Sequence, residues 1–271
     1  MRKTPSRSFW SKYRERWDST RSLVCVGLDS ELGKLPQHLR SEANPIWEFN
    51  RRIIDATCEN ACAYKPNLAF YLADGLRGLE ALYRTVEHIP AEIPVILDCK
   101  VGDIGNTMQG YVSAFFEDLG IDAITFNPLM GADVAKPILT NDSYFGFALA
   151  LTSNPSASDF LKRDGLAEHI SAWLEQYPST QIGAVLGATQ IEELRLMRSL
   201  LKGRILLIPG VGAQGGDLKA VMENAIDSIE YPDILINSSR GIIFKDSGET
   251  FAETAGNETL KLKQEIAAYL G

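Results

Sequence analysis

Three charged side chains stand within six residues where one short apolar run ends. Asp98, Lys100 and Asp103 follow the apolar residues 95–97, and Pro94 precedes the run. Such a run predicts a buried strand, along which alternation would place Asp98 and Lys100 on the same face. Buried charges are costly unless they neutralise one another. The cluster therefore indicates either an ion pair that caps a strand or the charged centre of an active site.

The rest of the chain alternates apolar strands with helical sequence eight times. Continuous apolar strands joined by crossover helices predict a parallel α/β sheet, and eight such units predict a closed (β/α)8 TIM barrel. A doubly wound sheet would need fewer repeats and would leave polar edge strands, which the sequence lacks. No linker divides the chain, so we expect a single barrel domain over residues 1–271. The expected strands are residues 23–28, 61–64, 95–97, 123–126, 145–151, 182–186, 205–208 and 234–236, and the last expected helix is 257–270.

An amphipathic helix is predicted before the first strand. Phe9, Tyr13 and Trp17 recur every four residues, which is the spacing of one helical face. We expect residues 1–20 to form an N-terminal helical extension that packs against the barrel.

Composition and cysteine usage restrict the partners and the compartment. A formal net charge of −8 argues against nucleic acid as the main partner. No apolar run approaches the ~18 residues of a transmembrane helix, so we expect no membrane partner. The four cysteines form no Cys-x-x-Cys pair and have no histidine pair beside them, so we expect no metal site. Buried free thiols are typical of a reducing compartment, which predicts a cytoplasmic protein.

Polar and charged residues gather where the expected strands end. In a β/α barrel these carboxyl ends meet at one mouth, where active sites lie. Turns alone do not require lysine or arginine at so many exits, so an active site explains the cluster better than a capping ion pair does. The residues concerned are Asp29, Lys65, Asp98, Lys100, Asn127, Ser153, Gln214 and Arg240.

The loop after the seventh strand has the form Gly210-x-Gly212-x-x-Gly215, the dinucleotide fingerprint. The position of this loop does not suit a dinucleotide, because the loop follows the seventh strand and not the first. The acid at the right distance for the ribose, Asp233, lies at the start of the eighth strand, at the opposite end from a ribose. Glycines nevertheless let backbone N–H groups approach an anion, and the last two loops of such barrels are the usual phosphate site. With Arg240 beside it, this loop predicts phosphate binding.

Together these residues resemble the orotidine 5'-phosphate decarboxylase family, in its longer bacterial branch. The resemblance covers residues 29–240, and its most specific part is Asp98-x-Lys100-x-x-Asp103-Ile104 joined to Thr107. Lys65, the segment 153–155 and the loop 210–216 followed by Arg240 support it.

The resemblance implies a chemistry and a set of residue roles. Members convert orotidine 5'-monophosphate to UMP and CO2 in de novo pyrimidine biosynthesis, without metal or organic cofactor. Lys100 matches the lysine that protonates C6, Asp98 the carboxylate beside the departing CO2, and Lys65 with Asp103 would complete an alternating charge network.

The remaining matches imply substrate contacts and a homodimer with shared active sites. Asp29 would hold ribose hydroxyls and Ser153 would contact the pyrimidine edge. Phosphate would bind to Gly212, Gln214 and Arg240. Asp103, Ile104 and Thr107 would reach the site of the partner subunit.

Two other functions are also compatible with these residues. A related phosphosugar decarboxylase or aldolase barrel would share the Asp-x-Lys-x-x-Asp element, but it would bind a metal through an acid where this chain has Lys65. The chain could also be a nucleotide-phosphate binder without catalysis, although it lacks none of the residues expected for turnover.

Overall fold

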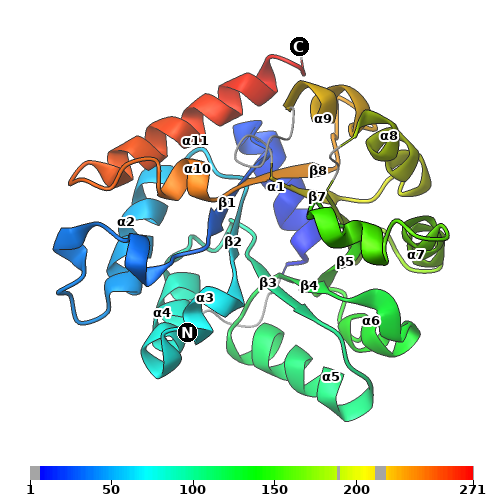
Figure 1. Ribbon diagram of the computed structural model, residues 1–271, viewed down its shortest axis with the longest axis horizontal. Helices are drawn as coiled ribbons and strands as arrows, with labels where there is room; N and C mark the ends of the chain where they lie inside the picture. Colours follow the sequence, from blue (N-terminus) through cyan, green and yellow to red (C-terminus); the bar gives the residue numbers. More distant parts are fainter. Residues whose placement is uncertain (1–6, 188–189, 211–217, 271) are drawn as a thin grey trace.

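The structure is a computed structural model that describes residues 7–187, 190–210 and 218–270. Its strands form one eight-stranded sheet in the order β2-β1-β8-β7-β6-β5-β4-β3, with every neighbouring pair parallel. Two parallel bridges, Tyr64↔Val95 and Asn67↔Asp98, join β2 to β3 and close the barrel. The predicted TIM barrel is confirmed (Figure 1). The strands are β1 Val24–Leu28, β2 Ala63–Pro66, β3 Ile96–Val101, β4 Ala123–Phe126, β5 Phe145–Leu151, β6 Ile182–Leu186, β7 Leu206–Pro209 and β8 Ile234–Ser238.

Helices surround the strands in an outer ring (Figure 1). The last helix begins at Phe251 rather than near the predicted residue 257. Phe251 is buried and stacks on Phe49 of α2 at 5.1 Å, so tertiary packing extends a helix whose first turn has no strong sequence signal. The helices are α1 Phe9–Thr20, α2 Pro45–Thr57, α3 Leu68–Leu72, α4 Gly75–His88, α5 Gly105–Val112, α6 Ala132–Ile138, α7 Leu166–Leu174, α8 Ile191–Leu200, α9 Leu218–Asn224, α10 Arg240–Ile243 and α11 Phe251–Ala267.

Helix α1 covers the N-terminal end of the barrel and crosses the centre of the ring in Figure 1. Its predicted apolar face, Phe9, Tyr13 and Trp17, is fully buried. The Phe9 ring contacts Phe145 of β5 at 4.7 Å, and the Trp17 indole N–H donates to the Glu230 carbonyl at 2.8 Å. Helix α1 of the predicted extension is therefore part of the core, whereas residues 1–6 of that extension lie outside the described residues.

Two ion pairs also fasten α1 to the starts of the strands. Lys12 Nζ lies 2.6 Å from Asp122 Oδ1, just before β4, and Arg14 Nη2 lies 2.8 Å from Asp233 Oδ1, just before β8. The second Asp122 oxygen accepts the N–H of Val95, just before β3. These ion pairs thus stabilise the N-terminal end of the barrel.

Among the described residues, none of the helices has both the length and the apolar character of a membrane span.

Phe9→Ala should lower the free energy of unfolding by about 3–5 kcal/mol, because it empties a packed aromatic site between α1 and β5. Denaturant unfolding followed by circular dichroism measures the change. Ile229→Ala is the control, since Ile229 is an exposed apolar residue at the same end and should change stability by less than ~0.5 kcal/mol. An equally small effect of Phe9→Ala would show that α1 is peripheral to the core.

Candidate active site

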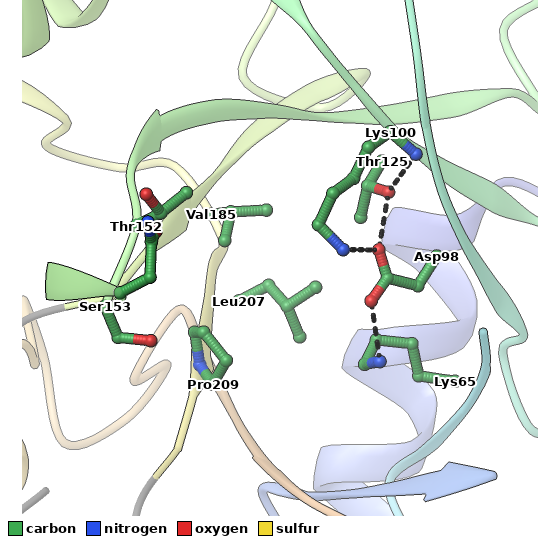
Figure 2. Close-up of a pocket in the computed structure, with 10 residues that line it drawn as sticks. Lys65, Asp98, Lys100, Thr125, Thr152, Ser153, Val185, Leu207 and Pro209 are labelled. Carbon is green, nitrogen blue, oxygen red and sulfur yellow. Dashed lines mark hydrogen bonds and ion pairs between the residues drawn. The ribbon is translucent and has the colours of Figure 1, made fainter. Parts of the chain in front are cut away.

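The centre of the site is a line of alternating charges at the carboxyl ends of β2 and β3. Lys65 Nζ lies 3.0 Å from Asp98 Oδ2, and Lys100 Nζ lies 2.5 Å from Asp98 Oδ1 (Figure 2). Asp29, just after β1, approaches Lys65 Nζ to 3.8 Å with its Oδ1. The structure thus brings together four of the predicted site residues.

Simple strand alternation does not explain how Asp98 and Lys100 meet. Lys100 has a φ of 49°, in the left-handed region, and the register between β3 and β4 shifts between Leu97 and Val101. A residue other than glycine in this region costs on the order of 1–3 kcal/mol, so the surrounding structure must impose it. The sequence prediction was right about the shared side of the two residues and wrong about the backbone geometry that produces it.

Thr125 of β4 contacts this distorted segment with its hydroxyl. Thr125 Oγ1 accepts the backbone N–H groups of Cys99 at 3.1 Å and Lys100 at 2.9 Å. The same hydroxyl donates to Asp98 Oδ1 at 2.9 Å. Thr125 was not among the predicted site residues, because an isolated threonine in a buried strand carries no distinguishing sequence signal.

The mutual attraction of these charges outweighs their burial. Burial raises the pKa of Asp98, but Lys65 and Lys100 overcome this effect and hold that pKa well below its ordinary value. For Lys65, only 4% exposed, burial lowers the pKa, while Asp98 and then Asp29 raise it above the ordinary value overall. Asp98 and Lys65 therefore carry full charges at neutral pH inside a water-poor site.

A cavity of about 220 Å³ opens beside this network. Thr152 and Ser153, which follow β5, lie across it from Lys100 and Asp98 (Figure 2). The wall between them is apolar and was not predicted, since ordinary barrel residues carry no chemical signature. Its residues are Val185, Leu207 and Pro209. A planar ring would fit between the charged wall and the polar wall, with the apolar side chains excluding water.

Three predicted site residues lie outside the lining of this cavity. Asp103 and Ile104 lie between β3 and α5, and Thr107 lies in the first turn of α5. Asp103 Oδ1 accepts the Ile104 N–H at 2.8 Å, and Ile104 is 53% exposed. None of the three lines the cavity of its own chain.

Of the three residues predicted to bind phosphate, Arg240 is the one that the structure describes. Arg240 is the first residue of α10, directly beyond β8, and its side chain is exposed. Within the described ranges it forms no ion pair, so its guanidinium is available to an anion. Gly212 and Gln214 lie outside the described residues.

In the described part of the chain, no group of three or more His, Cys, Asp or Glu side chains is placed to hold a metal ion. The basic residues Lys65 and Lys100 occupy the centre of the site instead.

Comparison with known proteins agrees with this geometry. The sequence profile of the orotidine 5'-phosphate decarboxylase / HUMPS family matches residues 22–255. The chain belongs to this family. Its orotidine 5'-phosphate decarboxylase relatives include a protein of Christiangramia forsetii, 43% identical over 257 residues, covering 92% of this chain and 94% of that protein. Another, from Herpetosiphon aurantiacus, is 42% identical over 260 residues and covers 91% and 93%.

Solved structures of similar proteins have the same barrel over nearly the whole length of this chain. The OMP decarboxylase of Leishmania donovani has a TM-score of 0.81 at 32% identity, covering 97% of this chain and 98% of that one. A crystal structure from Toxoplasma gondii has a TM-score of 0.88 at 31% identity and covers 97% of both chains. The resemblance inferred from Asp98, Lys100 and Asp103 is confirmed at the level of the family.

Proposed function

We propose that the protein is a carboxy-lyase that converts orotidine 5'-monophosphate to UMP and CO2 in pyrimidine biosynthesis. The observation that carries the proposal is the Lys65–Asp98–Lys100 network beside a cavity of ring-binding size. The names of the relatives more than 40% identical over most of the chain support the same substrate.

The proposed mechanism is electrostatic. Breaking the bond from C6 to the carboxylate leaves its electron pair on C6, and the ring delocalises that charge poorly. A site can accelerate this step only by favouring the developing carbanion over the ground state. Lys100 would face C6, stabilise the charge and transfer one proton from Nζ to it, after which solvent would restore the ammonium.

Asp98 and Lys65 would keep Lys100 charged and in place. Two unit charges ~4 Å apart attract by about 4 kcal/mol at an effective dielectric of ~20, before desolvation and solvent screening reduce the net energy. This attraction orients both ammonium groups toward Asp98, more strongly for the buried Lys65 than for the half-exposed Lys100. Asp98 would also lie beside the substrate carboxylate, which leaves as neutral CO2. The repulsion is then present in the ground state and relieved as the reaction proceeds.

The rest of the substrate would follow the mouth of the barrel. Asp29 and Lys65, with Asp103 of a second subunit, would bind the ribose hydroxyls, and Ser153 would contact the pyrimidine edge. The phosphate would lie at Arg240, with Gln214 and the backbone of Gly212. Binding energy from this remote phosphate would hold the ring against the network.

Arg240→Ala should raise KM for orotidylate about 10- to 100-fold, because it removes a charge-assisted contact to phosphate and leaves the proton donor in place. Steady-state kinetics measure the effect. Arg195→Ala on the outer helix α8 is the matched control, since Arg195 is exposed and bonded to Asn224 far from the mouth. An unchanged KM for Arg240→Ala would remove Arg240 from the phosphate site.

We further propose a homodimer formed through the segments that follow β2, β3 and β4. Exposed large apolar side chains collect there, and such a patch on one subunit indicates a protein interface. The residues are Leu72 and Leu76 at α3 and α4, Ile104 before α5, and Leu129 and Met130 after β4. Asp103 and Thr107 border the same patch, so a second copy would receive them at its own cavity.

A mixture of Lys100→Ala and Asp103→Ala proteins should regain activity that neither has alone. In a hybrid dimer one site combines an intact Lys100 with an intact Asp103, and the other site has neither. Equal mixing with free exchange should restore about a quarter of the wild-type activity. Exchange is checked by native mass spectrometry of the mixture. Confirmed hybrids without activity would indicate that each subunit has a self-contained site.

Two alternatives are separable by a simple assay. A phosphosugar enzyme of the same barrel group would use a metal-bound intermediate, which the ammonium of Lys65 disfavours by repulsion. A nucleotide-phosphate binder would bind UMP without turnover. The absorbance change as orotidylate becomes UMP tests the proposed function directly, and UMP binding without that change would favour the binder.

The free cysteines support a cytoplasmic location for the protein. All four cysteines are free, and Cys25 and Cys62 are fully buried. Free thiols are typical of the reducing cytoplasm, where we place the protein.

A further inference from the structure

We propose that Thr125 is a positioning residue of this site: its hydroxyl holds Lys100 in the left-handed backbone conformation and anchors Asp98, so that both lysines converge on one carboxylate. The proposal rests on the function proposed above and adds to it a residue that acts through Lys100 and Asp98.

The register of β3 against β4 creates a need for this hydroxyl. Leu97 pairs with Ile124 and Val101 pairs with Phe126. Three residues of β3 thus lie opposite the single residue Thr125. Such a bulge leaves peptide N–H groups without ladder carbonyls, and buried N–H groups require acceptors. Thr125 Oγ1 accepts the two groups concerned, from residues 99 and 100.

The three bonds use the full capacity of a hydroxyl. A threonine oxygen has two lone pairs and one proton. Both lone pairs accept from β3, so the proton has one direction left and points to Asp98 Oδ1 at 2.9 Å. Valine has the same shape and can make none of these bonds, whereas serine can make all three. Thr125→Val therefore removes the three hydrogen bonds without changing the shape, and Thr125→Ser keeps them.

The orientation of Asp98 connects Thr125 to the charges. Oδ1 is held by Thr125 and also accepts Lys100 Nζ at 2.5 Å, while Oδ2 faces Lys65 Nζ at 3.0 Å (Figure 2). Fixing one oxygen of a carboxylate fixes the other, so the hydroxyl determines which lysine each oxygen meets. Because the left-handed conformation of Lys100 is intrinsically unfavourable, losing two of its restraints should let the ammonium move from C6.

Three variants test the proposal by kinetics. Thr125→Val should lower kcat about 10- to 100-fold and leave KM within roughly threefold, because Thr125 lines the cavity but its hydroxyl has no hydrogen bond left for a substrate. Thr125→Ser should retain kcat within roughly threefold of the wild type. Thr259→Val is the control: it removes a buried threonine bond to the Ala255 carbonyl on α11 and should lower the melting temperature without lowering kcat.

A crystal structure of Thr125→Val with UMP completes the test. Lys100 should leave the left-handed region, or its Nζ should move beyond about 4 Å from Asp98. The proposal is overturned if Thr125→Val keeps its kcat, if Thr125→Ser loses as much as Thr125→Val, or if the valine variant keeps the Lys100 geometry. Should Thr125→Val not fold, the serine variant alone decides. A wild type inactive on orotidylate would refute the proposed function, while the crystal structure would still decide whether Thr125 holds Lys100.

Discussion

Lys100→Ala should lower kcat by at least about four orders of magnitude, because it removes the proton donor and the positive charge beside C6 together. The fold should survive. The Lys100 side chain is 48% exposed, so its ion pair with Asp98 contributes little to stability, about 1 kcal/mol or less after solvent screening. Turnover is followed by absorbance, and folding by circular dichroism.

A second lysine serves as the control for this substitution. Lys263 on α11 donates to Asn60 Oδ1 at 3.2 Å, and neither residue lines the cavity. Lys263→Ala should leave kcat unchanged. If Lys100→Ala kept even a tenth of the wild-type rate while binding UMP normally, Lys100 would not be the proton donor.

Asp98→Asn should lower kcat by about three orders of magnitude or more and also destabilise the fold. The substitution preserves shape but removes the charge between two ammonium groups. Among the described residues, Lys65 would then keep Asp29, at 3.8 Å, as its one carboxylate partner. Removing one member of a buried pair costs about 3–5 kcal/mol, because the other charge stays buried. Kinetics and denaturant unfolding measure the two effects.

The stability loss should depend on pH in a defined way. The folded pKa of Asp98 lies below 3.8, so its contribution is present above that pH and is lost as the pH falls. The folded pKa of Lys65 lies above 10.5, so its contribution is present below that pH and is lost as the pH rises. The difference between wild type and Asp98→Asn should therefore be constant from about pH 5 to 9 and shrink in acid.

Asp18→Asn is the matched control, since Asp18 is an exposed carboxylate on α1. It should change neither kcat nor the free energy of unfolding by much. A difference between wild type and Asp98→Asn that stays the same down to pH 2 would mean that Asp98 does not stabilise the fold through its charge.

The sequence predicted the barrel and the convergence of the site for the same physical reason. Parallel strands joined by crossover helices must bring their carboxyl ends to one mouth. Lys65 and Asp98, 33 positions apart, could therefore be predicted to meet without any knowledge of side-chain conformation. The apolar repeat of Phe9, Tyr13 and Trp17 was equally informative, because burial of one helical face is a local property of sequence.

Other features depend on tertiary context that a pattern does not contain. The left-handed conformation of Lys100 follows from the shifted register between two strands, and only then does Thr125 acquire its three partners. Val185 and Leu207 look like any other barrel residues until the cavity places them opposite the charges. The early start of the last helix depends on Phe251 packing against Phe49, which lies about 200 positions away in the chain.

Turnover of orotidylate by the EDTA-treated protein in D2O distinguishes proton transfer by Lys100 from metal-dependent chemistry. The reaction is followed by absorbance and by proton NMR of the product. We expect UMP that carries deuterium at C6, formed at a rate that EDTA does not change and that Lys100→Ala abolishes. Absence of UMP, or a rate that returns only when magnesium is added, would contradict this expectation.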